Sequence, residues 1–347
     1  MALSANKFGS VFSFTSFGES HGPALGVLIE GIPAGLPVNQ SLLEKNLQRR
    51  RPGNSPWVSQ RNEEDQPRTL SGIYEGRTLG TPVVVIVENK DARSEDYKDL
   101  VYRRGHADDL WADKFGHSDH RGGGRASGRE TLSRVIAGSF AQMMVSQMAP
   151  SLKVWGWTDS VGEISLSDSE RDHLGLQSNP VNFVDQCVGR FPSSLGKQNQ
   201  LSDLLVGARE NGRSFGGVAK IRIEGAIRGL GQPVFRKLKS EFASAFMSLG
   251  ATLGFELGVG FEATSQEGSV FHSKQVPESV YGGIRGGISS GDPIELSVAF
   301  KATSSVLDIA KKGRHDPCIV PRAVPVLEAM TYCVLADHLL WQRLDKI

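Results

Sequence analysis

Two strand-like runs separated by a short turn constrain the fold of this 347-residue chain more than any other feature. Residues 10–17 alternate loosely between apolar and polar side chains, and residues 24–30 are mostly apolar. Only the segment Gly18-Glu19-Ser20-His21-Gly22-Pro23 lies between them. Parallel strands need a crossover of about a dozen residues or more, whereas antiparallel strands can be joined by a tight turn. The two runs are therefore expected to pair as an antiparallel hairpin.

The other patterns extend this hairpin to an α+β fold. The clearest buried strand is TPVVVIV at residues 81–87, and further strands are expected at residues 219–223, 253–261 and 296–300. Helices are expected at residues 41–51, from residue 128 to before Pro150, and at residues 236–249 and 326–344. Because strands and helices do not alternate regularly, antiparallel sheets are favoured. No linker divides the chain, so residues 1–347 are expected to form a single domain.

Composition and charge exclude several classes of protein. The formal net charge is +1, so nucleic acid or an anionic membrane would have to be met by a local patch. Cys187, Cys318 and Cys333 are too few and too scattered for a disulfide framework or a zinc knuckle. There is no apolar leader segment, and no apolar run approaches the ~20 residues of a membrane span. A cytoplasmic protein is expected. Residues 151–215 are weakly patterned and indicate no function.

The turn FGESHGP contains a match to G-x-S-x-G, the nucleophile elbow of α/β-hydrolases. A serine hydrolase using Ser20 is therefore one hypothesis. An elbow needs a helix directly after the serine, but here Pro23, Gly26 and an apolar strand-like run follow. The context favours a turn between two strands, in which the two glycines present His21 instead.

The segment RGGGRASGRE, residues 121–130, predicts an anion site at a helix N-terminus. Ser127 and Glu130 match a capping box, with Ser127 as the N-cap. Arg129 lies in the first turn, where the helix dipole disfavours a cation, and Arg125 is just upstream. Two cations against a dipole are explained by a negatively charged ligand. The alternative is a flexible surface loop with solvated arginines.

The triplet Arg49-Arg50-Arg51, followed by Pro52-Gly53, has three interpretations. Cations at a helix C-terminus complement its dipole. Nucleic-acid binding is a second option, although no aromatic residues interleave with the arginines. Combined with the segment at 121–130, the triplet suggests guanidinium groups that hold a phosphate or carboxylate.

A loop rich in glycine, histidine and aspartate precedes the segment at 121–130. It contains Gly105, His106, Ala107, Asp108, Asp109, His117, Asp119 and His120. These side chains could bind a metal, but they lack the fixed spacing of a well-specified site, and none is expected. A histidine beside an anion site is also a plausible general acid.

Two segments near the C-terminus add donors and an acid. Lys301-Ala302-Thr303-Ser304-Ser305 offers a cation and three hydroxyl groups to a phosphate, and GRHDPC at residues 313–318 places Asp316 before a proline. The alternative for GRHDPC is a structural turn with a local ion pair. There is no Walker A or Rossmann fingerprint. A faint echo links RGGGRASG at 121–128 to RGGISSG at 285–291, and chance explains it equally well.

These segments, in this order, resemble the chorismate synthase family. The resemblance is carried by FGESHGP (17–23), RRRPG (49–53), GHAD (105–108), RGGGRASGRET (121–131), GGISSG (286–291), KATSS (301–305), GRHDPC (313–318) and PRAVPVLEAM (321–330). They span nearly the whole chain, and several are long and specific.

The resemblance implies a fold, a reaction and a cofactor. The implied fold is a β-α-β sandwich with helices between antiparallel sheets, usually assembled as a homotetramer. The implied reaction is the anti-1,4-elimination of phosphate from 5-enolpyruvylshikimate-3-phosphate to give chorismate, the last shared step of the shikimate pathway to aromatic amino acids. The family needs reduced FMN, whose flavin lends electron density transiently, although there is no net redox change. No flavin-reductase segment is visible, so a reductant derived from NADPH is expected from outside.

The resemblance also implies residue roles. His21 matches the acid that assists phosphate departure, with Ser20 as a relay. His106 matches the residue that protonates or orients the reduced flavin. Asp316 matches the residue that acts with flavin N5 in removing the substrate proton. The substrate-binding residues implied are His21, Arg50, Arg51, Arg129 and Arg314. The FMN-binding residues implied are Arg125, Ala126, Ser127, Gly250, Ala251, Gly286, Lys301, Ala302, Thr303, Ser304, Ser305 and Arg314. Ser127 also counts among the implied catalytic residues.

The chain departs from the family pattern at three positions. Arg104 stands where a proline usually precedes Gly105, Leu253 stands where a lysine is common, and Pro56 stands where some members carry an arginine. The connection from Ser305 to Arg314 is also shorter than in many members. None of these departures removes an implied catalytic residue.

Overall fold

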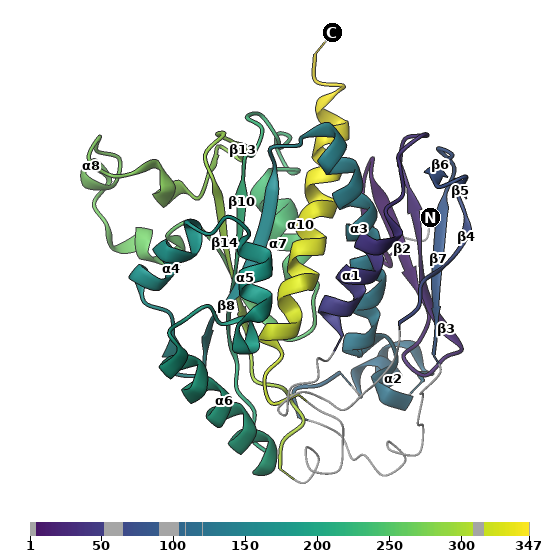
Figure 1. Cartoon of the computed structure of the whole chain (residues 1–347), viewed down its shortest axis with the longest axis horizontal. Helices are drawn as coiled ribbons and strands as arrows, with labels where there is room; N and C mark the ends of the chain where they lie inside the picture. The colour runs from purple at the N-terminus through teal and green to yellow at the C-terminus, as the bar shows by residue number, and fades with distance from the viewer. Residues whose placement is uncertain are drawn as a thin grey trace.

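Two antiparallel sheets with a layer of helices between them form the molecule (Figure 1). The computed structural model describes residues 5–51, 65–89, 104–107, 109–119, 121–307 and 316–346. Each of the two large sheets has five strands, and all their described pairings are antiparallel. The α+β sandwich expected from the sequence is confirmed.

The first sheet contains the predicted hairpin. Its strands, in spatial order, are β1 (Lys7–Gly9), β2 (Ser13–Phe17), β3 (Ala24–Glu30), β7 (Val83–Glu88) and β4 (Arg68–Ser71). β2 and β3 are paired from Ser13 opposite Glu30 to Phe17 opposite Gly26. The run TPVVVIV is β7, which pairs with β3 in the middle of the sheet and buries Val83, Val85 and Val87. Alternation along this strand thus sends one set of valines into the core.

The second sheet includes a strand that the sequence pattern does not reveal. Its strands, in spatial order, are β11 (Thr252–Leu257), β14 (Ile294–Phe300), β10 (Gly217–Glu224), β8 (Lys153–Val161) and β9 (Ile164–Ser165). β8 lies in the weakly patterned segment 151–215. Its residues are buried almost without alternation, and both α5 and α10 contact it. A strand covered on both faces has no period-two pattern to read. Two small hairpins complete the strands, β5 (Ile73–Tyr74) with β6 (Arg77–Thr78) and β12 (Ile284–Arg285) with β13 (Ile288–Ser289).

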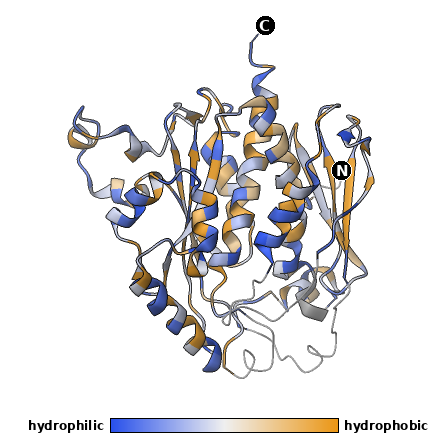
Figure 2. Ribbon diagram, viewed as in Figure 1, coloured by the Kyte–Doolittle hydropathy of each residue, from blue (hydrophilic) through white to orange (hydrophobic). Residues whose placement is uncertain are grey.

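The helices between the sheets are α1 (Gln40–Arg50), α3 (Thr131–Met148), α7 (Leu238–Met247) and α10 (Val320–Gln342). The other α-helices of the described residues are α2 (Leu110–Phe115), α4 (Asp168–Gly175), α5 (Pro180–Gln186), α6 (Leu195–Glu210) and α8 (Gly268–Phe271). Figure 2 shows hydrophobic residues concentrated on the strands and on the helices between them. This layer is the hydrophobic core of the molecule.

The terminal helix α10 begins earlier than the sequence suggests. The sequence predicts a helix over residues 326–344, but the helix begins at Val320, with Pro321 in its first turn and Pro325 inside it, and ends at Gln342. Proline is well suited to a first turn, because its missing N–H has no partner there. α10 is long and apolar enough to cross a membrane by length and composition, contrary to the expectation that no such run exists. However, 94% of its most apolar window is buried in the fold, as in a core helix.

Asp337 in α10 connects the end of the chain to its beginning. Its carboxylate accepts hydrogen bonds from the backbone N–H groups of Ser10 (2.9 Å), Val11 (2.6 Å) and Phe12 (3.0 Å). These residues lead into β2, so one carboxylate joins the last helix to the first sheet.

Three further expectations are corrected. The strand expected at residues 253–261 ends at Leu257, and the chain then forms a 3-10 turn over Gly260–Ser265. The helix expected to stop at Gly250 ends at Met247, and Ala251 takes the left-handed backbone conformation (φ 70°). The echo between the two glycine-rich segments has no structural counterpart, because Arg121–Ala126 is a 3-10 helix and the other segment forms the β12–β13 hairpin.

Candidate active site

A cavity of about 820 Å³ opens where the central helices begin or end. α1 and α7 end beside it, and α3 and α10 begin beside it, so the positive ends of two long helices point toward the same space. Eight lysine or arginine residues and three carboxylate residues are among its lining residues. This excess of cations suits a ligand with several negative charges.

Most of the residues implied by the sequence meet in this cavity. Those that line it are Arg50, Arg51, His106, Arg125, Ala126, Ser127, Arg129, Gly250, Ala251, Lys301, Thr303, Ser304, Ser305 and Asp316. Those that do not line it are Ser20, His21, Gly286 and Ala302. Arg314 lies outside the described residues.

A buried cluster of Arg50, Asp65 and Arg129 forms one wall. The Asp65 carboxylate pairs with the Arg50 guanidinium at 2.7 Å and with the Arg129 guanidinium at 2.5 Å. Arg50 is only 2% exposed and Arg129 only 7% exposed. Arg129 is therefore not the solvated loop residue of the alternative interpretation. Asp65 is absent from the sequence-based candidates, because it lies in the polar run NEEDQPR, in which no pattern distinguishes it.

The electrostatics of this cluster follow from its burial. Burial lowers the pKa of Arg50 to about 10, although Asp65 opposes the shift. Burial also opposes ionisation of Asp65, but Arg50 and Arg129 outweigh it and hold the pKa of the carboxyl below its usual value of 3.8. Two buried guanidinium groups therefore share one carboxylate, which leaves an excess positive charge at the cavity wall.

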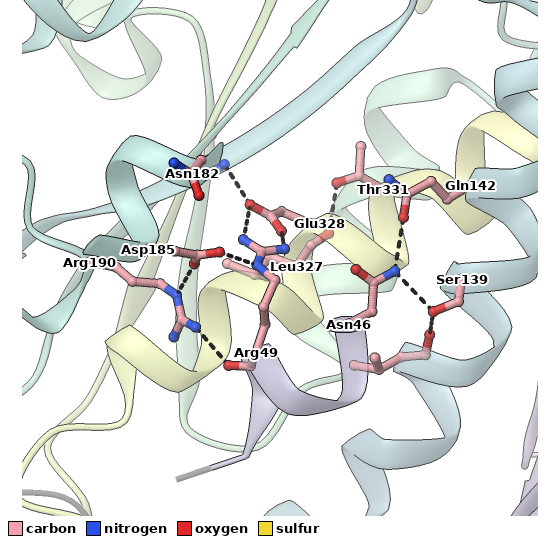
Figure 3. A network of polar contacts seen from close by, with 12 residues as sticks. Asn46, Arg49, Ser139, Gln142, Asn182, Asp185, Arg190, Leu327, Glu328 and Thr331 are labelled. Carbon is pink, nitrogen blue, oxygen red and sulfur yellow. Dashed lines mark hydrogen bonds and ion pairs between the residues drawn. The ribbon is translucent and has the colours of Figure 1, made fainter. Parts of the chain in front are cut away.

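The three consecutive arginines have different environments, because successive helix residues point about 100° apart. Arg50 and Arg51 line the cavity, whereas Arg49 points into the core between helices (Figure 3). Arg49 pairs with Asp185 at 2.6 Å and with Glu328 at 2.5 Å, and Glu328 also accepts from the backbone N–H of Gly156 at 3.0 Å. Only part of the triplet is thus available to a ligand.

Arg190 from the segment 151–215 completes this network (Figure 3). Its guanidinium pairs with Asp185 at 2.8 Å and donates to the backbone carbonyls of Arg49 at 2.7 Å and Pro321 at 2.5 Å. Pro325 has no N–H with which to bond the Pro321 carbonyl four residues before it. Arg190 supplies that missing donor, and it ties the end of α1 to the start of α10.

Asp316 and Arg322 face the cavity from the start of α10. They form an ion pair, and the Thr303 hydroxyl donates to the backbone carbonyl of Asp316 at 3.2 Å. Asp316 thus forms an ion pair, as in the alternative interpretation of the GRHDPC segment, but its partner Arg322 lies outside that segment, and the sequence assigned no role to it. Burial raises the pKa of the neighbouring Cys318 thiol to about 12, so this thiol stays protonated at neutral pH.

The KATSS segment lies beside the GHAD loop and the Gly250-Ala251 turn. Lys301 Nζ donates to Ser304 Oγ at 2.8 Å. Gly105 lies close to the same hydroxyl, because a Cβ atom added to this glycine would be 3.5 Å from Ser304 Oγ. The Lys301 N–H donates to the Ala251 carbonyl at 2.9 Å. Three segments far apart in the sequence thus form one donor-rich wall.

Gly286 lies near the N-terminal end of α7, whereas the cavity adjoins the C-terminal end of this helix. The β12–β13 turn packs against the start of this helix, where the Leu238 N–H donates to the Gly287 carbonyl at 2.8 Å. The cavity is lined instead by Ser248 and Leu249, just after the helix ends.

Ser127 caps a helical turn, but the predicted capping box is not formed. Its side chain accepts from the Arg129 N–H at the start of the 3-10 turn Gly128–Glu130, and α3 begins only at Thr131. The Glu130 carboxylate pairs with Arg134 at 3.0 Å instead of reaching back to the N-cap. A cationic partner one turn later competes successfully for this carboxylate.

Ser20 and His21 lie in the turn between β2 and β3, as the strand pattern predicts. Ser20 Oγ and His21 Nδ1 are 3.1 Å apart, and both side chains are buried. Because β3 follows directly, the helix of a nucleophile elbow is missing here. Arg125 links the turn to the cavity: it donates to the Gly18 carbonyl at 2.9 Å and to Ser16 Oγ.

A metal site is not formed by the part of the chain that the structure describes. Among those residues, no three His, Cys, Asp or Glu side chains are grouped to hold a metal ion. Asp108 and His120 of the candidate loop lie outside the described residues.

The sandwich and its cationic cavity define an enzyme for a small ligand with several negative charges. The family model described as chorismate synthase matches residues 12–340. The chain belongs to the chorismate synthase family.

Relatives agree with this assignment. The chain is 56% identical to the chorismate synthase of Bdellovibrio bacteriovorus over 99% of this chain and 100% of the relative. It is 40% identical to that of Paracoccus denitrificans, over 98% of this chain and 97% of the relative. A solved structure titled as a crystal structure of chorismate synthase is similar at a TM-score of 0.77 and 28% identity, covering 96% of this chain and 93% of the other.

Proposed function

We propose that the protein eliminates phosphate from 5-enolpyruvylshikimate-3-phosphate to give chorismate. Family membership supports this reaction, and one structural observation carries it: a single cavity gathers the buried Arg50–Asp65–Arg129 cluster, His106 and Asp316. The substrate carries a phosphate and two carboxylates. Guanidinium groups bind both kinds of anion through paired hydrogen bonds. Arg50, Arg51 and Arg129 are the proposed substrate clamp.

The cavity residues fit FMN. The cavity volume of about 820 Å³ lies in the range of small-molecule sites. Lys301, Thr303 and Ser304 offer a cation and hydroxyl donors to the phosphate of FMN. Arg125, Ala126, Ser127, Gly250, Ala251 and Ser305 are the other lining residues proposed to hold the cofactor. Reduced FMN supplies, when bound, a transient donation of electron density while the phosphate leaves. Roles for Ala302, Gly286 and Arg314 stay predictions.

Three residues are proposed to handle protons. Asp316, held by Arg322, would take up the substrate proton at its carboxylate, and His106 would protonate or orient the cofactor. His21 would act as the acid for the departing phosphate, with Ser20 Oγ at its Nδ1 as a relay. Ser127, which lines the cavity, is the other residue proposed to take part in catalysis. His21 is not a lining residue, but it belongs to the turn that Asn89 joins to Arg129 in the cavity wall.

Anaerobic phosphate release tests the proposal. Purified protein mixed with the substrate and photoreduced FMN should release phosphate and form chorismate. His106→Ala and Asp316→Ala should lower turnover by about 100-fold or more, as expected for loss of a general acid or base, with little change in substrate binding. Absence of phosphate release from protein with bound reduced flavin would contradict the proposed reaction.

We also propose a cytoplasmic enzyme that receives its reducing equivalents, derived from NADPH, from outside. The bound flavin should therefore stay oxidised when NADPH is added to the protein alone under anaerobic conditions. Bleaching of the flavin absorbance by NADPH without a reductase would overturn this part of the proposal.

A further inference from the structure

Asn89, directly after β7, contacts both the turn that contains His21 and the Arg129 side chain in the cavity wall. Its side-chain Nδ2 donates to the carbonyls of Gly22 (2.8 Å), Glu19 (3.3 Å) and Ser20 (3.4 Å). Its Oδ1 accepts from Nε and Nη2 of Arg129, both at 3.3 Å. Its backbone N–H donates to the Pro23 carbonyl at 3.0 Å. One carboxamide therefore contacts both the His21 turn and the cavity wall.

We infer that Asn89 is a positioning residue, which fixes the His21 turn relative to Arg129. The inference rests on the proposed function, in which His21 and Arg129 act on the same phosphorylated substrate. A carboxamide is suited to this position because it has donors on one side and an acceptor on the other. The three turn carbonyls need a donor, and the Arg129 guanidinium needs an acceptor. A carboxylate of the same shape satisfies only the guanidinium.

The surroundings show why the placement matters. Arg129 is held at two edges: Asp65 accepts from its Nη1 at 2.5 Å, and Asn89 accepts from its Nε and Nη2. Asp65 fixes Arg129 relative to Arg50, and Asn89 fixes it relative to the turn. A shift of the turn of about 1 Å is enough to reduce catalysis about 100-fold when reacting groups must be aligned.

Two variants separate the donor and acceptor functions of Asn89. Asn89→Asp keeps an acceptor for Arg129 but places a carboxylate against three carbonyl oxygens. We expect kcat for phosphate release to fall about 100-fold with KM within about threefold of the wild type. Asn89→Ala removes both contacts, so we expect a similar loss of kcat together with a KM raised about tenfold or more.

Asn46→Ala is the matched control. The Asn46 amide also bridges two partners, Ser139 at 3.0 Å and Gln142 at 2.9 Å, but this half-buried residue joins α1 to α3 and does not line the cavity. This variant should lower the melting temperature and leave kcat and KM unchanged. If both Asn89 variants behave like Asn46→Ala, or if Asn89→Asp keeps wild-type kcat, the inference is wrong. Should Asn89→Asp not fold, the combined kcat and KM change of Asn89→Ala decides the question.

A readout that does not depend on activity completes the test. The ¹⁵N chemical shifts of the His21 imidazole can be followed against pH in wild-type protein and in Asn89→Asp. A carboxylate introduced beside the turn favours the charged imidazolium, so the titration of His21 should move to higher pH. A shifted titration in a protein that releases no phosphate would contradict the proposed function and leave the link between Asn89 and His21 standing. An unshifted titration would contradict the link itself.

Discussion

At the scale of single residues, the main finding is that one carboxylate serves two buried guanidinium groups. Asp65 is the shared partner of Arg50 and Arg129, and both arginines line the cavity. Removing one partner of a buried ion pair is strongly destabilising, because it leaves an uncompensated charge in a poorly solvated place. Asp65 thus lies between the two arginines that are proposed to hold an anionic group of the substrate.

Asp65→Asn should therefore destabilise the protein by about 3 kcal/mol at pH 7 and make its stability more dependent on added phosphate. Phosphate can replace the missing negative charge, so it should raise the melting temperature of the variant more than that of the wild type. Thermal melts over a phosphate titration measure both effects. Equal gains in the two proteins would show that the arginines are not accessible to anions.

The pH dependence of stability gives an independent check on Asp65. The folded-state pKa of Asp65 is below its usual value of 3.8, so its stabilising effect is fully present above about pH 4 and is lost as the pH falls further. The wild type should lose more of its free energy of unfolding below pH 4 than Asp65→Asn does. Urea titrations at a series of pH values compare them, and parallel losses would refute the assignment.

At the scale of secondary-structure elements, Arg190 joins two helix ends that carry site residues. α1 ends at Arg50, and α10 begins close to Asp316 and carries Arg322 in its first turn. Arg190 donates to one carbonyl in each helix, and it does so from a left-handed backbone conformation (φ 52°) that non-glycine residues seldom adopt. Such a conformation persists only where the surrounding contacts hold it.

Arg190→Lys should remove this connection, because an ammonium group cannot reproduce the planar fork of a guanidinium. We expect a loss of about 1–3 kcal/mol in stability and a raised KM for the substrate. Arg171→Lys is a suitable control, since Arg171 makes a comparable two-bond contact with Asp159 (2.8 and 2.9 Å) away from the cavity. The control should lose stability only; an unchanged KM in Arg190→Lys would contradict the connection.

Helices and strands whose apolar residues recur with a clear period could be predicted from the sequence, and those without such a period could not. The β3 boundaries agree with the predicted run, and the predicted helix at 41–51 is α1 within one residue at each end. β8 was missed because burial of both faces removes the alternation. The first turn of α10 was also missed; it contains Pro321, and Pro325 lies inside the helix. Asp65, Asn89 and Arg190 have their roles through partners distant in the sequence, and no local pattern encodes such partners.

At the scale of the whole molecule, the second sheet carries an exposed leucine on one of its two edge strands. β11 is the edge strand, and its Leu253 side chain is 68% exposed. An exposed apolar edge strand is a common place for another chain to bind. We propose that a second copy of this chain covers the edge in a homotetramer. Burial in such an interface favours the apolar Leu253 over the lysine that is common at this position in the family.

Leu253→Asp should shift the solution mass from about four times the chain mass of 37.5 kDa to a smaller species. Leu195→Asp, at a leucine that is 75% exposed at the start of α6, should leave the mass unchanged. Size-exclusion chromatography with light scattering measures the mass. A tetramer that persists in Leu253→Asp would rule out this edge as an interface.

The bridge from Asp337 to residues 10–12 has a consequence for how the enzyme is made. The segment that leads into β2 is translated more than 300 residues before the carboxylate that orders its backbone. A growing chain cannot complete the sandwich, or bring Arg322 to the cavity, until α10 has been synthesised. Nascent chains stalled before residue 320 should therefore be sensitive to protease in β1 and β2, and active enzyme should appear only after release.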